Sequence, residues 1–331
     1  MKYRTLGQGL TVSAIGVGCM PMIKGGNIAY GADADPQEAT KTIHEAIDLG
    51  VTFFDTAEMY GPFSNEVLVG EAIKGKRDGL VIATKFAMRF DGNQMTGLDG
   101  SPANARRACE GSLMRLGIDT IDLFYQHRVD PAVPIEDTVG GMADLVKEGK
   151  VRHIALSEAG PETIRRAAKV HPITALQSEY SLWERDVEDD ILSACRENGI
   201  GFVPYSPLGR GFLTGDFKSR DDLPANDWRH NDPRFQGDNF AANLKIVEVI
   251  GNIAAAHGVS NAQIALAWLL VKGDDIVPIP GFKRRLTMAD SIAAVNVTLS
   301  AADIAALEAI APNGATAGPR YSERAMKMVR I

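Results

Sequence analysis

The alternation of short apolar runs with longer stretches of helical periodicity constrains the fold of this chain more than any other feature. Such runs, bounded by turn and helix signals, are typical of strands buried in a parallel sheet. Eight runs fit this description: 14–19, 51–56, 80–85, 121–127, 151–157, 174–179, 201–206 and 275–280. Amphipathic helical stretches separate most of them, at 36–49, 104–116, 135–148, 161–170 and 187–198. Repeated strand–helix units of this kind predict a parallel α/β fold.

The number of units favours a single (β/α)₈ barrel, or TIM barrel, as one domain over residues 1–331. No linker rich in Pro or Ser divides the chain into two domains. Long loops are expected after the third strand, at 91–100, and after the seventh strand, at 216–239, with a C-terminal tail at the end. Loops of this length usually hold a lid or a substrate-binding segment. The alternative, a doubly wound open sheet, would need a G-x-G-x-x-G turn that residues 16–21 do not complete.

Composition limits the class of function. The chain has 45% hydrophobic and 23% charged residues, as soluble globular proteins do, and its net charge of −7 argues against a nucleic-acid-binding surface. Its cysteines, Cys19, Cys109 and Cys195, are widely spaced, which favours a reducing compartment over a disulfide framework. We find neither a signal peptide nor a run of about 18 apolar residues, so we expect a cytoplasmic protein that does not bind a membrane. These patterns predict nothing about the oligomeric state.

Ionisable side chains end three of the predicted strands, at the edge where barrel enzymes place their active sites. They are Asp55, Lys85 and His127, and Tyr60 follows Asp55 after five positions. A lysine at the end of a buried run needs a carboxylate partner, and Asp55 is placed to be one. A charged Lys85 would favour the phenolate of Tyr60 and lower its pKa from the ordinary value of about 10. Together these groups suit protonation of a developing alkoxide, with His127 binding the substrate oxygen.

Each of these four residues also has a purely structural explanation. Asp55 could cap the following turn, and Tyr60 could be a half-buried aromatic residue with a satisfied hydroxyl. His127 could be a satisfied core histidine. Lys85 is harder to explain in this way because an unpaired buried ammonium is costly. Their common edge favours the catalytic interpretation, and no spacing of His, Cys and Asp indicates a metal site.

The motifs around these residues resemble those of the aldo-keto reductases, in order and over nearly the whole chain. The matching segments are 50–57, 60–61, 83–86, 112–113, 115–117, 121–123, 126–127, 149–152, 177–181, 205–211 and 278–281. The branch that the chain resembles includes perakine reductase-like and channel β-subunit-like members. The resemblance implies a (β/α)₈ barrel that reduces small aldehydes or ketones with a nicotinamide cofactor, usually NADPH. It also implies that Tyr60 donates the proton, that Lys85 and Asp55 adjust the acidity of Tyr60, and that His127 orients the carbonyl.

The same resemblance implies where the cofactor binds. Ser157 and Gln177 would hold the nicotinamide carboxamide, and Tyr205 would stack on the nicotinamide ring. The pyrophosphate and ribose would lie against Ser206, Leu208, Gly209, Arg210 and Gly211. The remaining candidates are Gly18, Cys19 and Met20 after the first strand, Gly281 after the eighth strand, and Asp290 and Ser291 towards the adenine.

Lys283 and Arg284 would meet the 2′-phosphate that distinguishes NADPH from NADH. An independent physical reason supports this assignment. A dianionic phosphate attracts cations, and residues 282–285 form the densest basic run of an acidic chain. We therefore expect NADPH as the cofactor, and NADH as the less favoured alternative.

Two regions depart from the pattern of the family. Many relatives carry Asn after the fifth strand, where this chain has Glu158, so the resemblance does not assure the usual amide contact with the cofactor. Relatives often carry Arg and then Glu-Asn near the adenine, where this chain has Thr287, Asp290 and Ser291. The adenine contacts are therefore the least defined part of the expected site.

Three functions are compatible with such a barrel. The first is reduction of a medium-sized aldehyde or ketone, with NADPH as the hydride donor. The second is a nicotinamide-binding regulatory or sensor subunit with low turnover, as in some relatives that bind membrane channels. The third, glycoside hydrolysis by Glu158 and Glu179, would leave Lys85 and Tyr60 without a purpose. The reductase hypothesis is favoured because it gives a role to every residue of the polar cluster.

Overall fold

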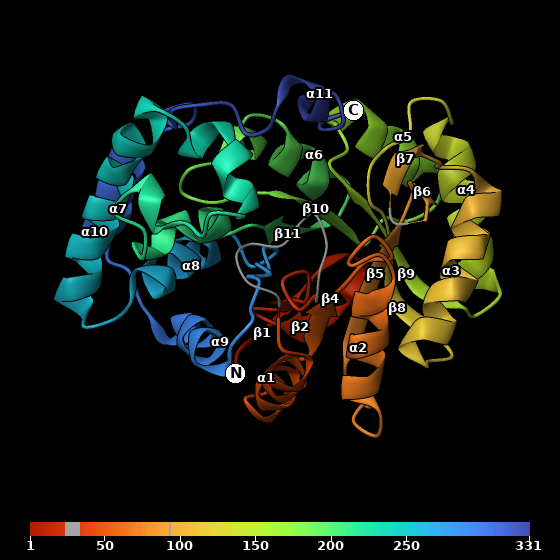
Figure 1. Cartoon of the computed structure of the whole chain (residues 1–331). Helices are drawn as coiled ribbons and strands as arrows, with labels where there is room; N and C mark the ends of the chain where they lie inside the picture. The colour runs from red at the N-terminus through yellow and green to blue at the C-terminus, as the bar shows by residue number, and fades with distance from the viewer. Residues whose placement is uncertain (24–33, 93) are drawn as a thin grey trace.

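Seven parallel strands form one continuous sheet at the centre of the molecule (Figure 1). The computed structural model describes residues 1–23, 34–92 and 94–331, so residue 93 of the predicted loop 91–100 lies outside it. The sheet order is β11–β10–β9–β8–β5–β4–β3. The strands are β3 (Val17–Gly18), β4 (Phe53–Asp55), β5 (Val81–Phe86), β8 (Ile121–Gln126), β9 (Val151–Ser157), β10 (Ala175–Glu179) and β11 (Gly201–Tyr205).

The eighth barrel position is filled by the segment 275–281, which makes parallel bridges to both edge strands, β11 and β3. The Gly16 and Gly18 amides donate to the carbonyl oxygens of Pro278 and Pro280, at 2.9 Å each. Because proline has no amide hydrogen, this segment cannot form a regular ladder on both sides. The predicted strand 275–280 is therefore present only as isolated bridges, and the barrel is nearly closed. The predicted fold class is confirmed.

Helices surround the sheet (Figure 1). The predicted helices are present with small shifts at their ends, except that 187–198 divides into a short turn, Asp186–Glu188, and α6. Four helices, α2, α9, α10 and α11, correspond to no helix predicted from the sequence. The helices are α1 (Pro36–Asp48), α2 (Ser64–Ile73), α3 (Pro102–Leu116), α4 (Ile135–Lys147), α5 (Pro161–Val170), α6 (Ile191–Glu197), α7 (Asp238–His257), α8 (Asn261–Val271), α9 (Arg285–Ile292), α10 (Ala301–Ile310) and α11 (Glu323–Met326).

Two antiparallel hairpins lie outside the barrel sheet. One pairs β1 (Tyr3–Thr5) with β2 (Thr11–Ser13), and its Leu6 and Val12 pack against the interior residues of the barrel. The other pairs β6 (Met88–Asp91) with β7 (Gln94–Leu98), in the loop predicted after the third strand. The predicted loop 216–239 contains three short 3₁₀ turns and leads into α7.

Among the described residues, no single helix is long and apolar enough to cross a membrane. The helices α7 and α8 meet that criterion only as a pair, and they are bent by 95° at the break between them.

The barrel interior explains why the functional residues converge. Side chains two positions apart on a strand face the same side of the sheet. On β5, Val81 and Ala83 belong to the interior cluster, so Lys85 also points inward, at the carboxyl end of the strand. By the same alternation, Asp55 follows the interior residue Phe53 on β4. The apolar interior therefore ends in a layer of polar side chains at one mouth of the barrel.

Two helical glycines test how tightly the outer layer is packed. A Cβ atom at Gly70 in α2 would lie 2.6 Å from the backbone oxygen of Leu116, whereas one at Gly140 in α4 would meet no atom within 4 Å. We expect Gly70→Ala to lower the free energy of unfolding by about 1–3 kcal/mol, because backbone cannot move aside cheaply. Gly140→Ala should instead raise it by up to about 1 kcal/mol through helix propensity. Urea unfolding of the two variants measures both effects, and equal changes would contradict the packing argument.

Candidate active site

Lys85 is the centre of the polar layer. Its ammonium donates to the Asp55 carboxylate, to the Thr56 carbonyl oxygen at 2.8 Å, and to the Tyr60 hydroxyl at 3.3 Å. Lys85 is completely buried, and Asp55 is 2% exposed. The three strand ends and the turn after β4 thus bring Asp55, Tyr60, Lys85 and His127 together, as the sequence predicts.

The ion pair is completed from the opposite side of the barrel. Gln177, on β10, donates from its side-chain amide to the second Asp55 carboxylate oxygen at 2.9 Å. Burial raises the pKa of Asp55, and the Lys85 ammonium and the Gln177 amide offset part of that rise. Burial alone would lower the pKa of Lys85, but Asp55 and Tyr60 raise it above its ordinary value, so the amine stays protonated. Every donor direction of this buried charge is occupied.

The Tyr60 hydroxyl is held in its neutral form. Burial raises the pKa of Tyr60 above the ordinary value, and the nearby Lys85 ammonium offsets only part of this rise. The sequence-based expectation of a lowered pKa is therefore wrong for the net value, because removal of the phenolate from water outweighs the single cation. A neutral phenol that touches an ammonium is suited to donate a proton.

His127 lies beside Tyr60 with its ring edge-on, at a centroid distance of 5.9 Å and an interplanar angle of 84°. Burial lowers the pKa of His127 well below its ordinary value, and the positive charges of Lys85 and Arg128 lower it further. The imidazole is therefore neutral, and its Nδ1 has no hydrogen-bond partner among the described residues. A neutral ring at the cavity wall can hydrogen-bond a substrate oxygen.

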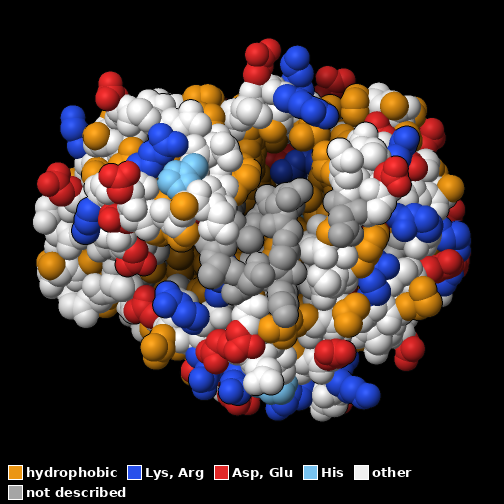
Figure 2. Space-filling view, viewed as in Figure 1, with side chains coloured by type: hydrophobic (Ala, Val, Ile, Leu, Met, Phe, Trp, Pro, Cys, Tyr) orange, Lys and Arg blue, Asp and Glu red, His pale blue; other side chains and the backbone are white. Residues whose placement is uncertain are grey.

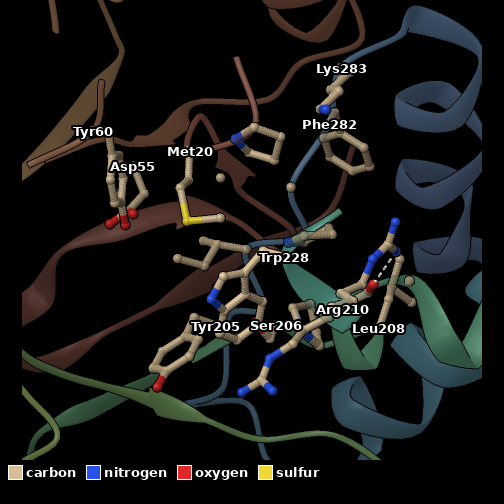
Figure 3. A pocket seen from close by; sticks show the side chains of 18 of the residues that line it. Met20, Asp55, Tyr60, Tyr205, Ser206, Leu208, Arg210, Trp228, Phe282 and Lys283 are labelled. Carbon is tan, nitrogen blue, oxygen red and sulfur yellow. Dashed lines mark hydrogen bonds between the residues drawn. The ribbon is translucent and has the colours of Figure 1, made fainter. Parts of the chain in front are cut away.

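A cavity of about 810 Å³ opens above these four residues. The space-filling view shows a hollow near the centre of this face, with hydrophobic side chains on its walls (Figure 2). Asp55 and Tyr60 lie at one end of the cavity, and Phe282 and Lys283 lie at the other (Figure 3). Asp55, Tyr60 and His127 line it, whereas Lys85 lies behind them. The cavity is long enough to connect the polar layer with the basic run after the eighth strand position.

Most of the predicted cofactor-binding residues line this cavity. They are Gly18, Met20, Gln177, Tyr205, Ser206, Leu208, Arg210, Gly211, Gly281, Lys283, Arg284, Asp290 and Ser291. The basic run itself is divided. Lys283 and Arg284 line the cavity just before α9, whereas Arg285 turns away and donates to Glu38 at 3.0 Å.

Three predicted residues are placed differently. Cys19 is buried with the outer cluster between β3 and the helices, because the alternation along the strand turns it away from the cavity. Gly209 has φ 57° and lies so close to the Trp183 ring that a Cβ atom would be 2.7 Å from it. Ser157 is reached from the cavity side by Arg128, which donates to its hydroxyl at 3.2 Å. Neither Cys19, Ser157 nor Gly209 lines the cavity.

Two lining residues are bound to neighbours within the protein. The guanidinium of Arg210 is bound by the buried carboxylates of Glu179 and Asp232. The carboxylate of Asp290 accepts from the Ser260 hydroxyl and from the Gln263 amide. A cofactor contact by either side chain would have to share these partners.

Part of the cavity wall was not predicted from the sequence. Tyr321, Ala325, Met328 and Val329 of the C-terminal tail, residues 311–331, line the cavity, as do the hairpin residues Met88 and Met95. Arg128 also lines it and donates to the backbone oxygen of His127 at 2.8 Å. The amphipathic tail carries no motif, so only the folded chain reveals its position.

The two carboxylates considered for glycoside hydrolysis are fixed in ion pairs. Glu158 and Glu179 are completely buried, and both are bound by Arg320 from the C-terminal tail. Neither lines the cavity. They cannot flank a sugar in this geometry, so the hydrolase hypothesis is discarded.

Comparison with known proteins identifies the class of this barrel. Residues 14–312 match the model of the aldo/keto reductase family, and the chain belongs to that family. The curated protein "Probable aldo-keto reductase 1" of Glycine max is 47% identical over 315 residues, which cover 95% of this chain and 90% of that protein. The sequence-based resemblance is thus confirmed.

Solved structures of similar proteins have the same barrel. A glycerol dehydrogenase from Gluconobacter oxydans gives a TM-score of 0.83 at 28% identity, covering 93% of this chain and 94% of its own. A thermostable aldo-keto reductase in complex with the inhibitor epalrestat gives 0.74 at 29% identity, covering 94% and 100%. The holo form of an aldo-keto reductase from Bacillus halodurans gives 0.76 at 25% identity, covering 98% and 99%.

The state of His127 can be measured directly. Because its pKa is lowered in the folded protein, we expect the ring to stay neutral between about pH 7.5 and about pH 5.5, where an ordinary histidine becomes protonated. Nitrogen-15 NMR of the histidine rings, assigned with His127→Gln, gives the protonation state. The unfolded chain takes up this proton first, so the contribution of His127 to stability is lost as the pH falls below about 6.5. A His127 ring that titrates near 6.5 would contradict the proposed burial effect.

Proposed function

We propose that this protein reduces the carbonyl group of a small aldehyde or ketone with NADPH, and that Tyr60 donates the proton. The observation that carries the proposal is the 3.3 Å contact between the Tyr60 hydroxyl and an ammonium that Asp55 keeps charged. A phenol in this position can lose its proton to an alkoxide because the remaining phenolate lies beside a cation. Membership of the aldo/keto reductase family agrees with this chemistry.

Each residue of the polar layer has a part in the proposed reaction. His127 donates a hydrogen bond to the carbonyl oxygen and fixes it near the Tyr60 hydroxyl. Lys85 stabilises the phenolate that forms, and Asp55 keeps Lys85 protonated in the apolar interior. When bound, NADPH supplies the hydride that reaches the carbonyl carbon. The cavity wall is mainly apolar, which strengthens these electrostatic interactions.

The residues of the cavity fit a dinucleotide that carries a 2′-phosphate. The cavity extends from Tyr60 to the pair Lys283 and Arg284, which stands at the amino end of α9. Two cations next to a helix N-terminus suit a phosphate dianion. At the other end, Gln177 and Tyr205 line the cavity near the polar layer and would contact the nicotinamide. We therefore propose NADPH in preference to NADH.

The wall beside the polar layer indicates the kind of substrate. Met20 and Met59 pack against Tyr60 and line the cavity, and Met88, Met95 and Met328 of the C-terminal tail line it as well. Methionine side chains are apolar and adapt their shape to a bound molecule. We propose carbonyl compounds with an apolar body, aromatic aldehydes among them, as substrates rather than sugars.

Replacement of the proton donor tests the mechanism. Tyr60→Phe should lower kcat for the reduction of a benzaldehyde by about 100-fold or more, because general acid catalysis is lost. The affinity for NADPH should be unchanged, since the ring remains. Loss of NADPH absorbance measures turnover, and intrinsic fluorescence measures cofactor binding.

Tyr125→Phe is the matched control. It removes another buried phenol hydroxyl of the barrel interior, one that does not line the cavity. This variant should retain turnover. Unchanged turnover in Tyr60→Phe would remove Tyr60 from the mechanism. Tight NADPH binding with negligible turnover in the unmodified protein would favour the sensor alternative.

Replacement of the basic pair tests the cofactor preference. Lys283→Ala combined with Arg284→Ala should weaken NADPH binding by about tenfold or more, and NADH binding far less, because only NADPH carries the phosphate. Arg285→Ala is the control, since this neighbouring cation is bound to Glu38 instead. Titration of each variant with both cofactors gives the ratio. Equal losses of both cofactors would mean that the phosphate binds elsewhere.

A further inference from the structure

Arg320 extends from the C-terminal tail into the mouth of the barrel. It lies only 3% exposed, although it belongs to a segment without regular secondary structure. Its guanidinium donates to the carboxylates of Glu158 and Glu179 and, at 2.7 Å, to the Tyr205 hydroxyl. One tail residue thus binds the ends of three consecutive strands, β9, β10 and β11.

The Tyr205 hydroxyl is held by two residues of the tail. Besides Arg320, its hydroxyl contacts the hydroxyl of Tyr321 at 2.7 Å. The Arg320 guanidinium also lies 5.7 Å from the centre of the Tyr205 ring. Both Tyr205 and Tyr321 line the cavity. The orientation of the Tyr205 ring, the surface proposed to stack on the nicotinamide, therefore depends on tail contacts.

Arg320 also compensates the charge that distinguishes this chain from many relatives. Glu158 is completely buried beside β10 and has φ 56°, a backbone conformation that is uncommon for residues other than glycine. One carboxylate oxygen accepts from Arg320 and from the Glu179 amide at 3.1 Å, and the other has no partner among the described residues. Removal of one member of a buried ion pair leaves an uncompensated charge. Without Arg320, the charge of Glu158 would be uncompensated next to Ser157, which is expected to hold the nicotinamide carboxamide.

The position of Arg320 is itself fixed. Its backbone oxygen accepts two hydrogen bonds from the Arg210 guanidinium, at 3.2 Å each, and Arg210 is bound by Asp232 and Glu179. The end of the tail is bound as well, since the Gly160 amide donates to the Ile331 carbonyl oxygen at 2.7 Å. Arg320 is therefore a rigid connection between the tail and the strand ends.

We propose that Arg320 is a positioning residue for the nicotinamide half of the cofactor, acting through Tyr205 and Glu158. The inference rests on the proposed binding of NADPH in this cavity. Arg320 does not line the cavity, so it acts only through the residues that it holds. The adenosine 2′-phosphate half would bind at Lys283 and Arg284, at the other end of the cavity (Figure 3). A change at Arg320 should therefore weaken the binding of the nicotinamide half and leave the binding of the adenosine half unchanged.

Two ligands separate the two halves. NADP⁺ contains the nicotinamide, and adenosine 2′,5′-bisphosphate contains only the phosphorylated adenosine half. Arg320→Met should weaken NADP⁺ by about tenfold or more and leave the affinity for the bisphosphate unchanged, as measured by calorimetric titration of both ligands. If Arg320 had a purely structural role, its replacement would lower the affinity for both ligands equally or for neither. Either of these results overturns the inference.

A matched control and a milder variant complete the test. Arg324→Met removes an exposed cation from the same tail and should change neither affinity. If Arg320→Met does not fold, Tyr205→Phe decides the question, because it removes the hydroxyl that Arg320 holds and keeps the stacking ring. It should weaken NADP⁺ selectively, and an unchanged NADP⁺ affinity overturns the inference. Failure of the unmodified protein to bind either ligand would instead overturn the proposed function, and the inference with it.

Discussion

The buried pair of Lys85 and Asp55 is the interaction on which the rest of the site depends. Burying two charges is costly, and their attraction offsets that cost only when the remaining donors and acceptors are also satisfied. Here Thr56, Tyr60 and Gln177 complete the hydrogen bonds. The pair therefore forms only when the carboxyl ends of β4, β5 and β10 meet at the same level of the barrel. A barrel that positions the pair also positions the phenol beside it. The strand arrangement that stabilises the buried ion pair is therefore the same one that positions the proposed proton donor.

A second group of buried charges lies at the carboxyl ends of β9 and β10. Arg320 and Arg210 bind Glu158, Glu179 and Asp232, and they connect the C-terminal tail with the ends of β9 and β10. The first group contains the proposed proton donor, and the second supports the proposed cofactor surface. Gln177 lies between them and binds Asp55. The tail is thus a part of the site, although it follows the last helix of the barrel wall.

Features that depend on residues close together in the sequence could be predicted, whereas features that depend on contacts between distant segments could not. The strands and the convergence of Asp55, Lys85 and His127 could be predicted because period-two alternation places them on one face at one edge. The same rule, applied to Cys19, would have excluded it from the cavity. The irregular eighth strand position follows from Pro278 and Pro280, whose missing amides were overlooked. The helix α2 was missed, and its Gly70 is required by contact with the distant Leu116.

The sequence by itself determined the family, the barrel and the set of ionisable residues at its mouth, because local periodicity and motif order encode these features. Only the tertiary structure decided which cations reach the cavity and which side chains carry charge. Lys283 and Arg284 line the cavity while Arg285 binds Glu38, and burial keeps Tyr60 and His127 neutral. The contact of Arg320 with Glu158 joins residues 162 positions apart. Desolvation and long-range pairing have no local signature, since both arise only when distant segments exclude water together.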